Sequence, residues 1–129
     1  MAPTILVVDD NEMNRAMVAD MLAAAGYGVA TAEDGEQALR QFGLTRPALV
    51  LLDIQMPGLD GYQVCRCIKQ NAAGRRTPVM LMSGLAGPES RAAGSAAGAD
   101  DFLAKPFLRA ELLARVELLL SGPAAARAS

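Results

Sequence analysis

The chain of 129 residues has no histidine, no tryptophan and only two cysteines. Without histidine it offers no imidazole to a metal ion, and it cannot itself carry a phosphohistidine. Aromatic residues make up only 4% of the sequence, whereas apolar residues make up 52%, so a core must be mainly aliphatic. That apolar share is enough for a core without disulfides, and the length suits a single domain.

The two cysteines, Cys65 and Cys67, lie two positions apart in a stretch with helical spacing. Residues at i and i+2 do not face each other on a helix, so this spacing favours reduced thiols over a disulfide. A thiolate metal site would also need further ligands. We therefore expect two free thiols, one of them buried.

The chain has neither an excess of basic residues nor a long apolar run. Lys and Arg total 12 against 14 Asp and Glu, a net charge of −2, whereas a nucleic-acid surface needs a basic excess. No apolar stretch approaches the roughly 20 residues that cross a membrane, and residues 1–10 lack the basic start of a signal peptide. We therefore expect a soluble, cytoplasmic protein without a nucleic-acid or membrane partner.

Short apolar stretches alternate with stretches of helical spacing along the chain. Aliphatic and β-branched runs predict strands at residues 4–9, 27–32, 48–53, 77–82 and 100–104. Helical spacing predicts helices at residues 11–25, 34–42, 61–70 and 86–97, and a last helix with an apolar stripe at Leu112, Leu113, Val116, Leu119 and Leu120. This alternation predicts an α/β fold, a doubly wound parallel sheet with helices on both faces. Residues 1–121 should form this domain, and residues 122–129 a flexible tail or the start of a linker.

Some side chains have local roles that spacing alone predicts. Asp34 should cap the helix that follows it, and Glu111 and Arg115 should pair at i, i+4. The methionines, being flexible and apolar, should fill gaps in the core. These residues are Met13, Met17, Met21, Met56, Met80 and Met82.

Polar residues follow four of the predicted strands at their carboxyl ends. The first strand leads to Asp9 and Asp10, and the third ends at Asp53. Ser83 follows the fourth strand and Lys105 the fifth. In a doubly wound sheet, ligands bind at the carboxyl edge, where the strand order changes direction. We therefore expect these side chains to lie together.

The chemistry of this set points to a metal ion and a phosphoryl group. Three nearby carboxylates repel one another unless a cation separates them, and Mg²⁺ prefers such oxygen ligands. Asp53 is the best nucleophile, because a carboxylate can form an aspartyl-phosphate. Lys105 supplies a positive charge and Ser83 a hydroxyl for phosphoryl oxygens. Taken alone, Asp9 and Asp10 could merely cap a helix, and the spacing of the whole set argues against that.

Four segments together resemble the signature segments of response-regulator receiver domains of two-component systems. They are Val7–Asp10 (VVDD), Leu51–Gly61 (LLDIQMPGLDG), Met82–Gly84 (MSG) and Asp100–Phe107 (DDFLAKPF). The resemblance covers residues 4–120 and implies a flavodoxin-like three-layer α/β/α fold with strand order 2-1-3-4-5. The segment Asp9–Arg15 (DDNEMNR) is similar to the opening of many receivers of hybrid kinases and stand-alone regulators.

The resemblance also implies roles for the acidic residues. Asp53 matches the phosphoacceptor of the family, and it also matches a metal ligand. Asp10 matches the acid that binds Mg²⁺ directly, whereas Asp9 matches a partner that acts through water. The backbone carbonyl of Gln55 matches the third protein ligand of the magnesium ion.

A switch is implied by three further matches. Ser83 matches the switch hydroxyl, and Phe102 matches the switch aromatic that turns inward when the hydroxyl moves to the phosphoryl group. Without the resemblance, Phe102 would be interpreted as a core residue. Lys105 matches the lysine that contacts the phosphoryl group, and the Lys105-Pro106 bond matches one that is typically cis in the family.

The function implied is that of a phosphoacceptor in a phosphorelay. A histidine kinase or histidine phosphotransfer domain would donate the phosphoryl group to Asp53 with Mg²⁺. The surface of the fourth helix, fifth strand and fifth helix would then change its affinity for an output domain or effector protein. The chain would be a monomer or a phosphorylation-dependent homodimer, and no enzyme beyond self-phosphorylation and slow self-dephosphorylation. Because the chain has no histidine, the donor must belong to another domain or protein.

Three alternatives compete with this function. An aspartate-nucleophile phosphatase needs a second acid two residues after Asp53, where this chain has Gln55. A flavin-binding module would place a Ser, Thr or Gly loop after the first strand, whereas residues 9–14 (DDNEMN) would repel a phosphate without a metal. A degenerate receiver would act as a phosphorylation-independent interaction module, but the complete set of acids and the lysine argue against it.

Overall fold

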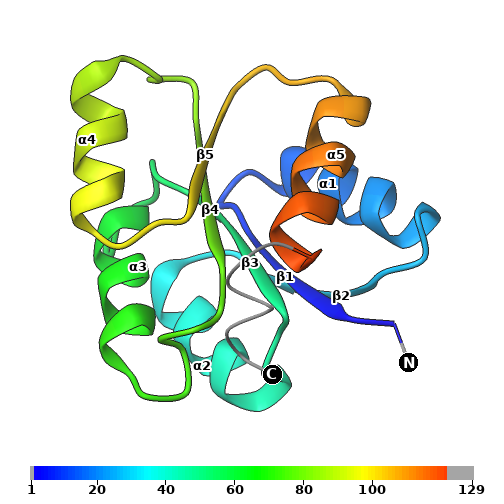
Figure 1. Cartoon of the computed structure of the whole chain (residues 1–129), viewed down its shortest axis with the longest axis horizontal. Helices are drawn as coiled ribbons and strands as arrows, with labels where there is room; N and C mark the ends of the chain where they lie inside the picture. The colour runs from blue at the N-terminus through cyan, green and yellow to red at the C-terminus, as the bar shows by residue number, and fades with distance from the viewer. Residues whose placement is uncertain (1, 122–129) are drawn as a thin grey trace.

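A five-stranded parallel sheet forms the centre of the computed structural model, which describes residues 2–121. The strand order is β2-β1-β3-β4-β5 (Figure 1). The strands are β1 (Thr4–Val8), β2 (Gly28–Ala32), β3 (Leu49–Asp53), β4 (Val79–Ser83) and β5 (Asp101–Ala104). The predicted fold class is confirmed, as is the strand order that the resemblance implied. The tail predicted at residues 122–129 lies outside the described residues.

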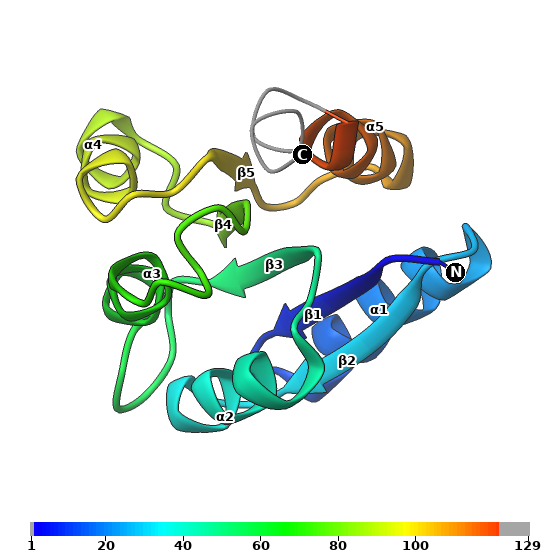
Figure 2. The ribbon, with the colours of Figure 1, turned by 60° about the horizontal axis from the view of Figure 1, so that its bottom comes forward.

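The helices alternate with the strands and cover both faces of the sheet. They are α1 (Glu12–Ala24), α2 (Gly35–Thr45), α3 (Gly61–Gln70), α4 (Pro88–Ala96) and α5 (Arg109–Ser121). Helices α1 and α5 cover one face, and α2, α3 and α4 cover the other (Figures 1 and 2). Within residues 2–121, no helix is long and apolar enough to cross a membrane.

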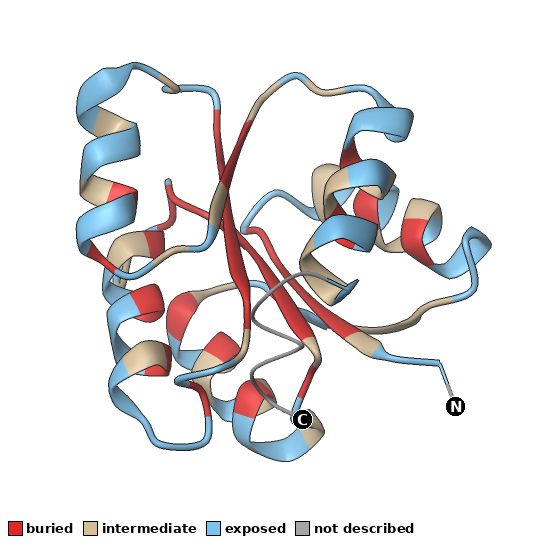
Figure 3. Cartoon of the chain, in the orientation of Figure 1, coloured by how far each residue is buried: buried red, intermediate tan, exposed pale blue. Residues whose placement is uncertain are grey.

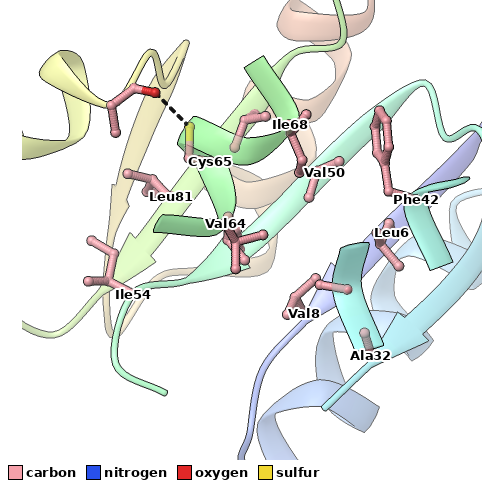
Figure 4. Close-up of a cluster of buried hydrophobic side chains, with 14 of the residues drawn as sticks. Leu6, Val8, Ala32, Phe42, Val50, Ile54, Val64, Cys65, Ile68 and Leu81 are labelled. Atoms are coloured by element: carbon pink, nitrogen blue, oxygen red, sulfur yellow. Dashed lines mark hydrogen bonds between the residues drawn. The ribbon is translucent and has the colours of Figure 1, made fainter. Parts of the chain in front are cut away.

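The core consists of two hydrophobic clusters, one on each face of the sheet. Successive side chains of a strand point to opposite faces, so Ile5 and Val7 pack with α1 and α5, whereas Leu6 and Val8 pack with α2 and α3. Figure 4 shows the cluster that contains Leu6 and Val8. Every residue of β3 and β4 is buried (Figure 3), which explains why these strands are continuous apolar runs.

Most element boundaries match the prediction, and the differences have local causes. Helix α4 begins at Pro88 instead of Ala86, because Gly87 is its N-cap and proline suits the first turn. Helix α2 continues to Thr45, and Arg46 ends it in the left-handed conformation with φ 46°. The Asp34 side chain accepts a hydrogen bond from the Gln37 backbone N–H, which confirms the predicted cap.

The prediction that all six methionines fill the core is wrong for two of them. Met13 is 82% exposed and Met17 is 46% exposed. Helix α1 turns Val18 and Leu22 toward the sheet. Met17 lies about 100° around the helix from Val18, and Met13 lies one turn before Met17, so neither belongs to the buried face of the helix. Both expectations for the thiols are confirmed, because Cys65 is buried, Cys67 is exposed and both are free.

The contact between α3 and the end of β3 leaves no space for a side chain at Gly61. A Cβ there would lie 2.6 Å from the Asp53 carbonyl oxygen and 2.7 Å from the Ile54 Cα. The Gly61 backbone N–H also donates a hydrogen bond to the Ile54 carbonyl at 2.9 Å. Both close contacts are to backbone, which cannot move aside as a flexible side chain can.

We expect Gly61→Ala to lower the free energy of unfolding by about 1–3 kcal/mol, the usual cost of overpacking. Gly43→Ala in α2 is the matched control, because a Cβ there meets nothing within 4 Å. It should raise stability by up to about 1 kcal/mol through helix propensity. Urea denaturation would measure both, and equal effects of the two substitutions would contradict the packing argument.

Candidate functional site

Three acidic side chains converge where β1 and β3 end. The two strands are neighbours, and their register pairs Val8 with Leu52, so Asp9 and Asp53 follow at the same level of the sheet. One carboxylate oxygen each from Asp9, Asp10 and Asp53 lie within 4.8 Å of one another. The chain leaves β1 for β2 on one side and crosses back to β3 on the other, so this is the point where ligands bind in such sheets.

The three acids differ in their exposure to solvent. Asp9 is 1% exposed and Asp53 is 5% exposed, whereas Asp10 is exposed. The buried acids therefore need positive charge nearby, since burial disfavours an unpaired carboxylate. An all-oxygen donor set of this geometry suits a hard divalent cation such as Mg²⁺.

Lys105 brings a positive charge to this cluster from the far side of the sheet. Its ammonium nitrogen lies 3.2 Å from Asp9 Oδ2 and 3.4 Å from Asp53 Oδ1. The Lys105 backbone N–H donates to the Ser83 carbonyl at 2.8 Å, which extends the β4–β5 pairing up to the site. The Lys105-Pro106 bond is cis, as the resemblance implied.

Burial and charge act in opposite directions on the Asp53 carboxyl. Burial raises its pKa, the Lys105 ammonium lowers it, and Asp9 and Asp10 raise it again, with a net rise from 3.8 to about 6. Loss of water is the largest of these effects. The charged form of Asp53 is thus costly without a cation, and a divalent cation at the cluster would favour it.

Ser83 and Phe102 lie on the neighbouring strands. Ser83 is the last residue of β4 and is buried, and its hydroxyl oxygen accepts a hydrogen bond from the Leu85 N–H at 2.9 Å. Phe102 is 7% exposed and packs in the core cluster next to Gly94, beneath the guanidinium of Arg91. In this conformation the Phe102 ring is therefore part of the core.

Two further residues, Gln55 and Arg15, lie near the acids. Gln55 lies two residues after Asp53, and its side chain is exposed. Sequence reasoning assigned no role to Arg15, the last residue of the Asp9–Arg15 segment. One of its guanidinium nitrogens donates to the Asp9 carbonyl at 2.8 Å. The Asn11 side chain caps α1, and Arg15 lies four residues after it, one helical turn on. This spacing is the signal that could have found Arg15.

Comparison with known proteins identifies the family. The model of the response regulator receiver domain matches residues 5–117, which is most of the chain and includes all of the residues described above. The chain belongs to the response regulator receiver domain family. The receiver fold thus agrees with the resemblance carried by the four sequence segments.

Relatives of this receiver domain differ in length. The transcriptional regulatory protein PrrA of Mycobacterium leprae is 44% identical over 119 residues, which cover 92% of this chain and 50% of PrrA. Protein PilG of Pseudomonas aeruginosa is 40% identical over 113 residues, which cover 88% of this chain and 84% of PilG. The receiver domain therefore spans about half the length of PrrA and most of PilG.

A solved structure resembles the receiver domain closely. It is the receiver domain of the sensor histidine kinase PA1611 from Pseudomonas aeruginosa, with a magnesium ion coordinated in its active site cleft. The two share 36% identity with a TM-score of 0.88, over 95% of this chain and 100% of the other.

The raised pKa of Asp53 makes a prediction for stability without metal. Because the folded-state pKa of about 6 exceeds the usual 3.8, native stability should fall as the pH rises from about 4 to about 6, with the full cost above about 6. Asp53→Asn removes this cost, so it should stabilise the domain by roughly 1–3 kcal/mol near pH 7 and much less near pH 4. Urea denaturation in EDTA would measure the difference.

Asp20→Asn is the matched control, because Asp20 is an exposed acid on α1. It removes a carboxylate from an exposed position without changing the buried cluster, so a gain specific to Asp53→Asn would be local to that cluster. Added Mg²⁺ should reduce the gain from Asp53→Asn, since only the native cluster keeps all three acids. A gain that is the same at every pH would show that burial of the Asp53 charge is not its cause.

Proposed function

We propose that this receiver domain accepts a phosphoryl group on Asp53 from a phosphohistidine of a sensor histidine kinase or a histidine phosphotransfer domain. The observation that carries the proposal is the Lys105 ammonium, which contacts both Asp9 and Asp53 within a three-acid cluster. An acidic cluster alone has several uses, whereas a lysine beside the nucleophile suits phosphoryl oxygens. The missing histidine is then explained, because the donor lies on another domain or protein.

In the proposed transfer, an Asp53 carboxylate oxygen attacks the phosphorus atom. The bond between phosphorus and the donor imidazole nitrogen breaks, and the imidazole leaves with the electron pair and takes a proton from water. The product is an aspartyl-phosphate, which water later hydrolyses slowly. No turnover of other substrates is proposed.

The acids Asp9, Asp10 and Asp53 would hold Mg²⁺, together with the backbone carbonyl of Gln55. The three carboxylate oxygens within 4.8 Å fit this ion, as does their exclusive use of oxygen. When bound, Mg²⁺ offsets the negative charge of the acids and of the phosphoryl oxygens. The magnesium ion in the PA1611 receiver domain supports the assignment.

Two side chains of this chain would bind the phosphoryl oxygens. Lys105 would exchange its contact with Asp53 for a contact with the phosphoryl group, at a site where its ammonium is already in place. Ser83 accepts a hydrogen bond from Leu85 N–H and thus keeps its own hydroxyl proton for a phosphoryl oxygen. A shift of Ser83 toward Asp53 would draw the β4–α4 loop with it.

The proposed response is a change in the surface formed by α4, β5 and α5. Phe102 lies on β5 beneath this surface and packs under the guanidinium of Arg91 in α4, so a shift of the loop before α4 would alter its packing. That surface would bind an output domain or effector protein, or a second copy when phosphorylated. The length of PrrA is consistent with a further domain in some relatives. Residues 1–121 would form the receiver, and residues 122–129 a tail or linker.

We expect Mg²⁺-dependent labelling of the native domain by a small phosphodonor such as acetyl phosphate, and none of Asp53→Asn. The amide of Asn keeps the size of Asp but is not a nucleophile, so the loss should be complete. Intact-protein mass spectrometry would count the phosphoryl groups. EDTA should abolish labelling of the native protein.

Asp20→Asn is again the matched control and should label like the native domain. Labelling of Asp53→Asn at the native level would place the phosphoacceptor elsewhere. A native domain that never labels, with Mg²⁺ present, would favour the degenerate receiver that acts as an interaction module.

A further inference from the structure

Arg15, in the first turns of α1, reaches back over the loop that carries Asp9 and Asp10. Its Nη1 donates a hydrogen bond to the Asp9 carbonyl oxygen at 2.8 Å. The side chain is only 17% exposed, although it is charged. A charge-assisted hydrogen bond in such a position is stronger than a neutral one. Arg15 therefore fixes the backbone at the point where β1 becomes the metal-binding loop.

Backbone groups hold the same loop at two other points. The Asp9 N–H donates to the Ala32 carbonyl at 3.2 Å, and the Asn11 N–H donates to the Asp9 carboxylate at 2.9 Å. The Asn11 side chain in turn caps α1 by accepting from the Asn14 N–H. The N–H, carboxylate and carbonyl of Asp9 are thus all engaged, and Arg15 is the side chain that engages the carbonyl.

The second guanidinium nitrogen faces Glu33 on the neighbouring loop. Arg15 Nη2 lies 3.9 Å from Glu33 Oε2, and the Glu33 side chain is 61% exposed. An ion pair this long and this exposed contributes little energy. The Glu33 backbone is itself held in place, because its N–H donates to Gln37 Oε1 at 2.8 Å in α2.

We propose that Arg15 is a positioning residue for the metal site, which holds the Asp9 carbonyl so that the carboxylates of Asp9 and Asp10 present their oxygens to Mg²⁺. The inference rests on the proposed function, because it assumes that this cluster binds Mg²⁺. It assigns a physical role to the arginine that ends the Asp9–Arg15 segment. The planar fork of arginine suits two acceptors, whereas a lysine ammonium offers a single point charge.

Charge and position predict opposite effects when Arg15 is removed. By Coulomb's law alone, a cation beside a Mg²⁺ site weakens binding of the metal, so loss of Arg15 would tighten it. If Arg15 instead positions the loop, its loss frees the acids to spread apart and weakens binding. The sign of the change in Mg²⁺ affinity therefore distinguishes the two roles.

The test is a titration of native protein and Arg15→Ala, Arg15→Gln and Arg15→Lys with MgCl₂ at constant ionic strength, followed by backbone amide NMR shifts. We expect the dissociation constant for Mg²⁺ to rise on the order of tenfold for Ala and Gln. Arg15→Lys should lie between these and the native protein. Arg75→Ala is the matched control, because it removes the same charge from an exposed position. Arg75 lies in the loop before β4, near the amino ends of the strands, whereas the site lies at their carboxyl ends.

A second measurement separates positioning from a general loss of structure. Labelling by acetyl phosphate at increasing Mg²⁺ should follow a curve displaced to higher Mg²⁺ in Arg15→Gln, with the native rate regained at saturation. Circular dichroism would show which variants are folded. If Arg15→Ala does not fold, Arg15→Lys and Arg15→Gln serve in its place. A rate that stays low at saturating Mg²⁺ would overturn the positioning role.

The failure of this inference can be told from failure of the proposed function. If the native protein binds Mg²⁺ and labels, but Arg15→Ala and Arg15→Gln bind Mg²⁺ as tightly as native protein or tighter, only the role of Arg15 is overturned. If the native protein neither binds Mg²⁺ nor labels, both fall. A weakening of the same size in Arg75→Ala would also overturn the assignment, because the effect would then not be local to the loop.

Discussion

The balance of charge at the carboxyl edge of the sheet is the constraint on which the site depends. Three carboxylates meet there within 4.8 Å, and two of them, Asp9 and Asp53, are buried. The ammonium of Lys105 contacts both buried acids and offsets part of their repulsion. The acidity that remains suits a divalent cation. The pKa of Asp53 is raised mainly because burial removes water from its carboxylate, and the Lys105 ammonium only partly offsets this effect.

This balance requires a rigid sheet, because its members come from distant parts of the chain. Asp9 and Lys105 are 96 positions apart in sequence, yet their charged atoms are 3.2 Å apart. The central strands are buried on both faces, so their ends cannot move independently. Behind Asp53, the backbone of α3 at Gly61 packs against β3 so closely that no side chain fits between them. The core thus holds the charges in place.

The sequence predicted the elements well and their exposure less well. Alternating apolar runs identified all of the strands, because burial on both faces gives a strong local signal. The cap at Asp34 is also local, since a side chain three residues before a backbone N–H is already in reach. The methionines of α1 show the limit. Met17 and Val18 are both apolar, and only packing against the sheet decided that Val18 is buried and Met17 is not.

The sequence by itself determined the chemistry of the site: three acids, a hydroxyl and a lysine at strand ends, with no histidine to serve as their own donor. It also determined that these groups share one edge, because parallel strands end together. Only the tertiary structure decided which atoms meet. Lys105 touches Asp9 as well as Asp53, and Arg15 binds the Asp9 carbonyl. Periodicity is a property of neighbouring residues, whereas burial and ångström-scale contact between distant residues depend on how the helices pack against the sheet.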